Sequence, residues 1–481
     1  MCFYNKKTTI RILCLALCVL FVLGMAGCGK AKTSSEASSD TTDSNAFLEF
    51  DNEKGEGIKN NTSSTEKRTD SKALNASEGV TVTEKVKLDG DDPFANIPKK
   101  LRGTTVVFAH FGDEGAAEYQ KVCKAFTKKT GIKVKLLSYD QAAYIATVSK
   151  QIAARSAPDV IICNETFPHA LEIAQPIQNL LDLKESFWDS SVTKATTIGG
   201  NTYFVNSLKG VWHNIDMIFY NKKIFSENSL RSPADYYKSG EWTYENLRKC
   251  LEDVKATGNV GGYVDPKMMA ASMGSALVSY NSDTKTFAQN VKNAIPAYQY
   301  SAYNATNGLW DHNLWFGIFN NGTIGLYHNS AYGCKYNGWF EGIDASMVGA
   351  VPTPSSYNGK PCKQTENMRA YGLSKGAKNP EGAAYFLRYF LDYSYYKEAG
   401  ANVFINKELE KAYFHSLDVM AKEGVNYYFN DSALEYTQVT YKDLRNTGNA
   451  KPAAVPSEMM AVENQFQDAV NKMNAKIAAL K

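Results

Sequence analysis

Between residues 104 and 164 the chain alternates between strand-like and helix-like sequence, and this order restricts the fold more than any other feature. Apolar runs long enough for a buried strand alternate with segments that carry apolar residues at helical spacing. The five pieces are, in order, TTVVFAHF, GDEGAAEYQKVCKAFTKKTG, IKVKLLSY, DQAAYIATVSKQIAARSA and PDVIICN. Strand, helix, strand, helix, strand predicts an α/β layer with a parallel sheet.

Polar side chains follow the first and the last of these strands. Ligands of parallel sheets bind beyond the carboxyl ends of the strands. Phe111, Asp113 and Glu114 come after the first strand, and Asn164 and Glu165 end or follow the last one. We therefore name these five as candidate ligand contacts. The alternative reading is that Asp113 caps the next helix and that Asn164 and Glu165 are turn residues.

The rest of the body continues with strand and helix patterns but contains no internal repeat. EWTYENLRKCLEDVKATG predicts a helix with Thr243 as its N-cap. A strand, a turn and a helix that begins at Pro380 follow later, and the C-terminal third is mostly helical. A body of about 380 residues is too large for one hydrophobic core and implies two lobes.

The N-terminus has the order of an export signal. A basic start with Lys6, Lys7 and Arg11 precedes residues 12–27, which carry no charge. This apolar run is shorter than the ~20 residues of a spanning helix, so a signal peptide is the better interpretation. Met25–Cys28 resembles the lipobox of bacterial lipoproteins, which implies cleavage before Cys28 and acylation of that cysteine. Two or three acyl chains make a stable membrane anchor.

Residues 28–95 are dominated by Ser, Thr, Asp, Asn, Lys and Glu. Such a composition cannot bury enough apolar surface to offset the entropy of ordering. We expect a disordered tether between the lipid anchor and the folded body.

Composition excludes some classes of partner and site. The net charge of +3 is too small to indicate nucleic acid. Of the nine cysteines, five remain in the body, with wide spacings and no CxxC, which supports neither a disulfide framework nor a zinc site. We expect each to be a small buried apolar residue, and leave open a pair between two of them, Cys334 and Cys362. The five are Cys123, Cys163, Cys250, Cys334 and Cys362.

Several segments, in order along residues 104–400, together resemble the extracellular solute-binding proteins of ABC importers, in particular the sugar-binding group of the maltose-binding-protein type. The resemblance implies an α/β, two-lobed, periplasmic-binding-protein-like clamp with the ligand cleft between the lobes. The segments are FTKKTGIKVKLL, PDVII, NTYFVN, IFYNKKIF, EWTYENL, FNNGTIGLYHNSAY, VGAVPTP and YGLSKGAKNPEGAAYFLRYF.

The same resemblance implies a domain organisation. The chain is expected to cross between the lobes near Ser207–Val211, near Met368–Tyr371 and within the 385–396 helix. The resulting parts are a lipoprotein signal peptide (1–27), a lipidated tether (28–95), lobe 1 (96–208 with 369–395) and lobe 2 (209–368 with 396–481).

Sugar recognition needs aromatic faces and oriented polar groups for the hydroxyls. Tyr332 occupies the place where the family often has a stacking Trp. Trp212, beside the first crossing, is either a stacking ring or interlobe core. Tyr263 and Asp265 are candidates in the second lobe, and Arg369 is a candidate at the second crossing.

The remaining aromatic candidates are assigned to packing. Trp242, before the capping Thr243, is interpreted as a packing residue at a helix start. Trp310 and Trp315 are interpreted as core.

Signatures of enzymes are missing from the sequence. It contains no GxSxG, HExxH or P-loop pattern. Its six histidines, at 110, 169, 213, 312, 328 and 415, lack metal-ligand spacing and are interpreted as solvated or hydrogen-bonded. A carboxylate pair for glycoside hydrolysis depends on a three-dimensional distance that a sequence does not give. We expect no catalytic residues, no metal and no cofactor.

The sequence thus predicts a monomeric, lipid-anchored protein on the extracellular face that captures a mono- or oligosaccharide for ABC permease subunits. The candidate loops carry three acidic residues, Asp113, Glu114 and Glu165. They favour a ligand with hydroxyl groups or a positive charge over an anionic ligand. The alternatives are the same fold with a polyamine, peptide or other small solute, and a sensor's binding protein without a transport role.

Overall fold

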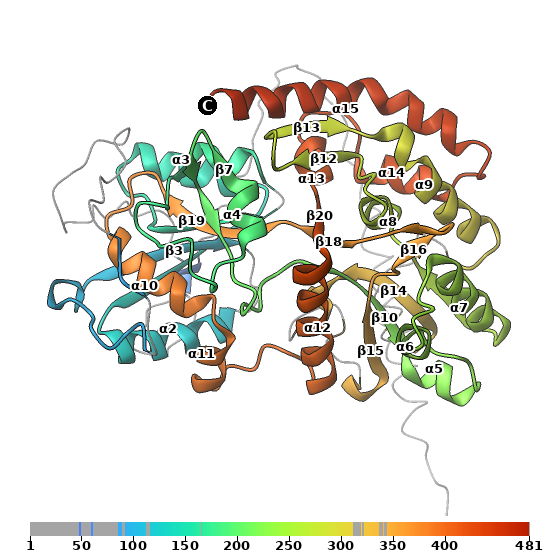
Figure 1. Ribbon diagram of the computed structural model, residues 1–481, viewed down its shortest axis with the longest axis horizontal. Coiled ribbons are helices and arrows are strands. Elements are labelled where there is room, and N and C mark those ends of the chain that lie inside the picture. The colour runs from blue at the N-terminus through green and yellow to red at the C-terminus, as the bar shows by residue number, and fades with distance from the viewer. Residues whose placement is uncertain are drawn as a thin grey trace, which may run out of the picture. The chain divides into compact units, whose positions relative to one another are not determined.

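The computed structural model describes residues 48–49, 59–60, 85–88, 92–111, 116–164, 166–310, 319, 322–335, 340 and 344–480. Residues 1–47 lie outside this description, so the signal peptide and Cys28 are not part of it. The body from residue 45 onward is one compact unit with two lobes, each built around its own sheets (Figure 1).

Lobe 1 is built on one eight-stranded sheet. The three strands expected from residues 104–164 run parallel, as predicted, and a late strand from the second half of the chain is inserted antiparallel beside the third. The sheet order is β2 (Lys59–Asn60), β1 (Leu48–Glu49), β4 (Lys133–Tyr139), β3 (Thr105–Phe111), β5 (Val160–Asn164), β19 (Arg369–Ser374) and β6 (Ala174–Gln175), with β9 (Phe204–Val205) pairing β19 outside this path.

Helices cover this sheet with apolar faces. Tyr119, Val122 and Phe126 of the first helix are buried, and that helix ends before Gly131, whose φ of +76° suits glycine. The Phe108 ring of β3 lies 5.6 Å from the ring of Phe386, which belongs to the helix that starts at Pro380. The helices of lobe 1 are α2 (Ala116–Thr130), α3 (Tyr144–Ala153), α4 (Ser190–Thr196), α10 (Pro380–Phe390) and α11 (Tyr393–Glu398), with short 3-10 turns η1 (Lys99–Leu101) and η2 (His169–Glu172) and the hairpin β7 (Thr197–Ile198) and β8 (Asn201–Thr202).

Packing begins upstream of residue 96, where the sequence places the start of lobe 1. Leu88 and Phe94 are buried, and the Phe94 ring contacts Phe126 and Tyr389. These two apolar side chains lie in a stretch that is polar on average. The average composition of the segment therefore did not predict their burial. The short strands β1 and β2 also fall within the expected tether and extend the sheet beyond β4. Most of residues 28–95 lies outside the described residues, so the tether stays a prediction.

Lobe 2 contains two four-stranded sheets. The first has the order β11 (Val260–Tyr263), β14 (Ile324–Ser330), β10 (Asp216–Asn221) and β15 (Val348–Pro352). The second has the order β13 (Thr286–Gln289), β12 (Val278–Asn281), β20 (Val425–Tyr428) and β18 (Gln364–Asn367). Every residue of β10 is buried, because β14 and β15 flank it and helices cover the sheet.

The helices of lobe 2 follow the sequence pattern closely. Thr243 caps α7 by accepting a hydrogen bond from the Asn246 amide, as predicted. Trp242 is 2% exposed and its Nε1 donates to the Pro352 carbonyl at 2.8 Å, which confirms a packing role. Trp310 is also buried, and Trp315 lies outside the described residues. The helices are α5 (Lys222–Glu227), α6 (Pro233–Lys238), α7 (Tyr244–Ala256), α8 (Pro266–Ser272), α9 (Val291–Thr306), α12 (Lys407–Glu423), α13 (Asn430–Leu434), α14 (Tyr441–Asn449) and α15 (Val455–Ala478), with the turns η4 (Ala331–Cys334) and η5 (Ala345–Met347) and the hairpin β16 (Ser356–Tyr357) and β17 (Lys360–Pro361).

Three stretches of chain link the two sets of sheets. Residues 206–215 lead from β9 to β10, and Met368 joins β18 directly to β19. The third link, residues 399–406, follows α11, which packs on α2 of lobe 1, and precedes α12 (Figure 1). It therefore lies after the 385–396 helix in which the sequence resemblance places it. A short separate helix, α11, was not distinguished from α10 by sequence pattern.

A buried polar contact joins the first link to the end of β18, directly before the second link. Nδ1 of His213 lies 3.1 Å from the Glu366 carboxylate, and the same carboxylate accepts a hydrogen bond from the Asn214 amide at 3.0 Å. The other ring nitrogen of His213 lies 3.0 Å from the Ser207 carbonyl oxygen. Burial alone would lower the pKa of His213, but the adjacent Glu366 carboxylate outweighs burial and raises that pKa above its usual value.

All five cysteines of the body are buried and unpaired as disulfides, so Cys334 and Cys362 do not form a pair. Burial raises the pKa of each thiol, as expected for small side chains surrounded by apolar atoms. Within the described residues, no helix combines the length and the apolar character that crossing a bilayer requires.

Candidate functional site

The carboxyl ends of β3 and β5 lie at the edge of the lobe 1 sheet that faces lobe 2. This follows because β19, paired antiparallel with β5, begins there directly after the link at Met368. The register places Asn164 opposite Arg369, so two of the sequence candidates from distant segments become neighbours. Asp113, Glu114 and Glu165 lie outside the described residues, and so does the side chain of Phe111. They stay predictions.

Asn164 presents a buried hydrogen-bonding group without a protein partner. The residue is 5% exposed, and within the described part of the chain its Oδ1 accepts no hydrogen bond. Buried side-chain oxygens are nearly always satisfied, because an unsatisfied one costs about 1–3 kcal/mol. A solute hydroxyl would satisfy this oxygen, which makes Asn164 the best-supported of the sequence candidates.

Trp212 lies between cationic and aromatic side chains of both lobes. Its Nε1 donates to the Tyr396 hydroxyl at 2.7 Å, and the ring packs edge-on against Tyr119. The Lys335 ammonium and the Arg369 guanidinium lie 4.9 and 5.4 Å from its ring centre. Because Trp212 is only 2% exposed, it is interlobe packing in this arrangement. Its ring becomes available for stacking only if the lobes separate.

In lobe 2, Tyr263 and Asp265 form one network at the end of β11. The Tyr263 hydroxyl donates to the Asp265 carboxylate at 3.0 Å, and that carboxylate also caps α8 by accepting from the Lys267 amide at 2.8 Å. The Tyr263 ring lies 5.3 Å from the rings of Trp310 and Tyr327. Burial, together with Asp265, raises the pKa of Tyr263 well above its usual value, so this hydroxyl keeps its proton.

Tyr332 follows β14 and lies in the turn η4. Its amide donates to the Ser330 hydroxyl at 3.4 Å, and its side chain is partly exposed. A partly exposed ring after a buried strand fits the stacking role that the sequence resemblance assigns to it. Ligand contact by Tyr332 stays a prediction.

His328, on the same strand, differs from its interpretation as a solvated or hydrogen-bonded histidine. It is fully buried, and neither ring nitrogen has a hydrogen-bond partner among the described residues. Burial lowers its pKa to about 4, which Asp265 only partly opposes. His328 is therefore neutral at physiological pH and is not a charged ligand contact.

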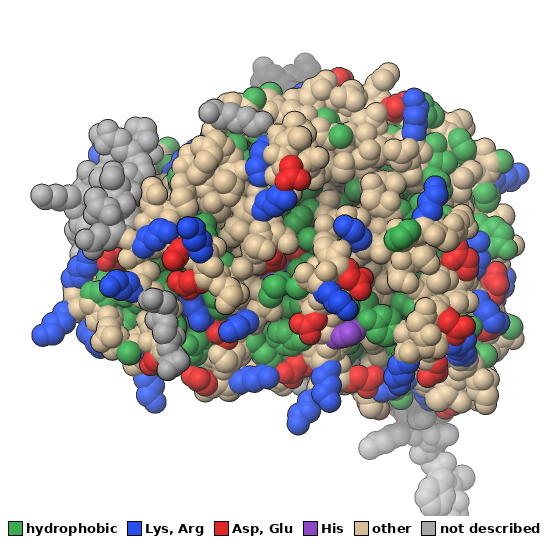
Figure 2. All heavy atoms as spheres, viewed as in Figure 1, with side chains coloured by type: hydrophobic (Ala, Val, Ile, Leu, Met, Phe, Trp, Pro, Cys, Tyr) green, Lys and Arg blue, Asp and Glu red, His purple; other side chains and the backbone are tan. Residues whose placement is uncertain are grey.

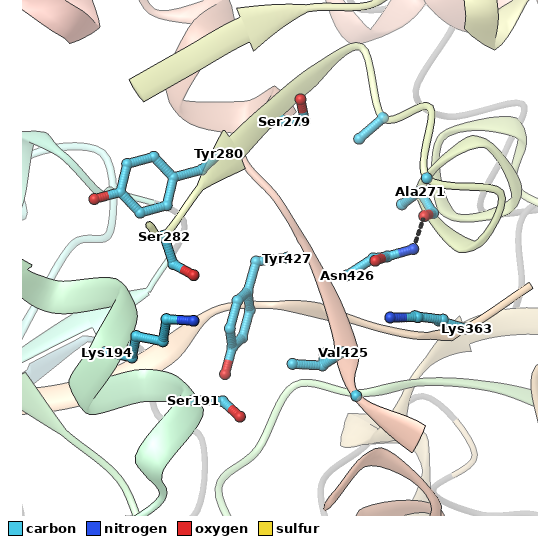
Figure 3. Close-up of a pocket in the computed structure, with 13 residues that line it drawn as sticks. Ser191, Lys194, Ala271, Ser279, Tyr280, Ser282, Lys363, Val425, Asn426 and Tyr427 are labelled. Atoms are coloured by element: carbon cyan, nitrogen blue, oxygen red, sulfur yellow. Dashed lines mark hydrogen bonds between the residues drawn. The ribbon is translucent and has the colours of Figure 1, made fainter. Parts of the chain in front are cut away.

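A cavity of about 280 Å³ lies between α4 of lobe 1 and α8, β12, β18 and β20 of lobe 2 (Figure 3). We call it the interlobe cavity. None of the site residues expected from sequence lines it. Its walls come from segments that are far apart along the chain, namely Ser191, Lys194, Ala271, Gly274, Ala276, Ser279, Tyr280, Ser282, Lys363, Gly424, Val425, Asn426 and Tyr427. No local sequence signal marks these residues, because only the tertiary fold brings them together.

The model of the family described as bacterial extracellular solute-binding protein matches residues 109–397, which is more than half of the chain. The chain belongs to this family. Comparison with curated protein sequences gave no match.

Solved structures support the same fold. The cyclic α-maltosyl-1,6-maltose binding protein from Arthrobacter globiformis aligns with a TM-score of 0.55 at 15% identity, over 78% of this chain and 99% of its own. The GacH receptor of Streptomyces glaucescens, studied with acarbose, has a TM-score of 0.54 at 17% identity, over 79% and 99%. An ABC substrate-binding protein from Listeria monocytogenes in complex with cycloalternan has a TM-score of 0.51 at 15% identity, over 78% and 99%. At these identities the likeness establishes the two-lobed fold.

Proposed function

We propose that this protein captures a carbohydrate between its lobes and delivers it to an ABC permease, as a monomer held to the outer face of the membrane by acylated Cys28. The observation that carries the proposal is the buried, unsatisfied amide oxygen of Asn164 at the carboxyl edge of the lobe 1 sheet. The similar folds described above were solved with, or are named for, oligosaccharides and an oligosaccharide analogue, which supports the same class of solute here.

Asn164, its strand partner and the aromatic candidates together have the chemistry that carbohydrate recognition needs. Arg369 supplies a guanidinium, and Tyr332 and Trp212 supply aromatic faces, the second of which is covered in the present arrangement. Hydroxyl groups are both donors and acceptors, so they satisfy an amide oxygen and a guanidinium together. No step of this proposal requires bond making or breaking, so we propose binding and transport without catalysis.

The surface does not favour a nucleic-acid partner. Figure 2 shows basic and acidic side chains interspersed over the face viewed, with no single large basic area. Together with a net charge of +3, this favours a small solute and the permease as partners.

A thermal-shift screen of the full-length protein against mono- and oligosaccharides, polyamines and short peptides tests the proposal. A solute that binds only the native state raises stability by RT ln(1 + [L]/Kd), or about 2.7 kcal/mol at a hundredfold excess over Kd. We expect a saccharide to produce the shift. If a polyamine or a peptide stabilises the protein and no saccharide does, the ligand is that solute and not a carbohydrate.

A matched pair of asparagine variants locates the site. Asn164→Ala removes an acceptor that has no described protein partner, so we expect binding to weaken about tenfold or more with little loss of stability. Asn379→Ala is the control at the opposite end of the same sheet. Asn379 caps α10 and donates to the Thr104 hydroxyl, so its loss lowers stability and leaves the affinity unchanged. Normal binding by Asn164→Ala contradicts the placement of the site.

A further inference from the structure

We propose that the interlobe cavity is a second binding site, separate from the carbohydrate site, for a small anion that carries carboxylate or phosphate groups. The inference stands on the composition of the cavity walls, and it goes beyond the proposed function because no residue assigned to carbohydrate binding lines the cavity.

The walls supply positive charge and no negative charge. Lys194 from α4 and Lys363, directly before β18, both line the cavity, and no Asp or Glu is among its lining residues. In Figure 3 the two ammonium groups point toward the middle of the cavity from opposite sides. Both lysines are exposed, so solvent screens their mutual repulsion, and an anion between them would be attracted to both. The arrangement therefore favours an anionic occupant.

The two lysines are not equally available. Lys194 is paired with Asp283 at 2.7 Å, on the turn between β12 and β13, but the Asp283 side chain is 74% exposed and well solvated. An exposed pair of this kind contributes little to stability, so an anion in the cavity competes with it at small cost. Lys363 forms no ion pair with any residue in the described part of the chain.

Neutral donors complete the site. The side chains of Ser191 and Ser282 line the same space, whereas the Tyr280 hydroxyl already donates to the Ala195 carbonyl at 3.1 Å and the Asn426 amide to the Ala271 carbonyl at 3.0 Å. The Tyr427 hydroxyl is buried, and among the described residues it has no hydrogen-bond partner. An O–H that donates to a charged oxygen makes a stronger hydrogen bond than one between neutral groups. An anion in the cavity would contact both lysines at once, and the buried hydroxyl that donates to it would be that of Tyr427, whose pKa is raised by burial and by the Asp189 and Glu366 carboxylates.

The volume suits a solute larger than a single ion. About 280 Å³ is several times the ~30 Å³ share of one water molecule in the liquid. An occupant with two or more anionic groups can reach Lys194 on lobe 1 and Lys363 on lobe 2 together. Because it contacts both lobes, it stabilises the arrangement in which these walls face each other.

The test uses the full-length protein with inorganic phosphate and with citrate, each compared with sodium chloride at equal ionic strength. We expect saturable stabilisation by one of these probes in a thermal-shift titration, confirmed by calorimetry. Lys194→Gln and Lys363→Gln should each weaken binding about tenfold, because each removes one charge-assisted contact. Lys360→Gln is the control, since Lys360 is an exposed lysine on neighbouring β17 that does not line the cavity.

Tyr427→Phe keeps the test decisive if a lysine variant folds poorly, because it removes a single oxygen and no charge. We expect it to weaken anion binding as well. If phosphate and citrate act no differently from chloride, or if the cavity variants bind the anion like the wild type, the proposal is wrong.

Saccharide binding is measured in parallel to separate this proposal from the carbohydrate function. We expect Lys194→Gln and Lys363→Gln to keep saccharide affinity. Loss of saccharide binding in both variants, with competition between saccharide and anion in the wild type, would make the interlobe cavity the carbohydrate site and overturn the second site. If no saccharide binds, the anion titration alone decides whether the interlobe cavity is an anion site.

Discussion

The neutral, buried His328 makes stability depend on pH in a way that can be calculated. Its pKa is about 4 in the folded protein and about 6.5 in the unfolded chain. As pH falls below 6.5, the unfolded chain binds a proton that the folded protein does not accept until about pH 4. The group therefore contributes stability above pH 6.5 that is lost progressively as pH falls toward 4. With ~1.36 kcal/mol for each pKa unit, the loss is about 2 kcal/mol between pH 7 and pH 5 and about 3 kcal/mol by pH 4.

Urea unfolding followed by tryptophan fluorescence at pH 7 and pH 5 measures this loss in the wild type and in His328→Leu. The variant replaces the imidazole by an apolar group of similar size that does not titrate, so its stability should fall about 2 kcal/mol less over the same interval. Contributions from all other groups cancel in the comparison. His415→Leu is the matched control for replacing an imidazole by an apolar side chain, because His415 is exposed. Equal pH dependence in the wild type and in His328→Leu would refute the assignment of a neutral, unsatisfied histidine.

Four further outcomes follow from the fold and the site. Trp242→Ala should cost about 3–5 kcal/mol of stability, seen as a lower melting temperature, and leave ligand affinity unchanged, because the ring and its Nε1 contact are internal to lobe 2. Tyr332→Ala should do the reverse and weaken saccharide binding at least tenfold by calorimetry, from about 1.5–3 kcal/mol of lost burial; unchanged affinity would remove Tyr332 from the site. Cys28→Ala should release the protein from membranes or block processing of the signal, and normal retention with cleavage would count against lipidation. The five body cysteines should react with a thiol reagent at pH 8 only after unfolding. Burial raises their pKa values, to about 11 for Cys362 and about 12 for Cys250 and Cys334. Rapid labelling of the native protein would contradict this prediction.

Periodicity and capping predicted the elements of this protein well, because these signals are local. The parallel strands β3, β4 and β5, the Thr243 cap and the helix that begins at Pro380 each depend on residues within a few positions of one another. The end of α10 was harder to predict from sequence. The break before α11 depends on Asp392, which caps the new helix, and the apolar pattern continues across this break.

The candidate site was only partly accessible from sequence. Asn164 and Arg369 were each named as candidates from their position, but their pairing depends on a strand that enters the sheet from the other half of the chain. The burial of Trp212 depends on how both lobes pack around it, and the unsatisfied state of His328 depends on both neighbouring strands. The interlobe cavity was missed altogether. Its two lysines have the sequence context of ordinary surface lysines, and only tertiary structure gives them a shared space.

The buried contact between His213 and Glu366 has a mechanical consequence. It ties the first connecting stretch to the end of β18, directly before the second connecting stretch. Two stretches tied together in this way can adopt fewer relative orientations than two independent ones. Fewer accessible orientations before a solute arrives mean less entropy lost when the lobes close around it, so more of the contact energy remains as affinity.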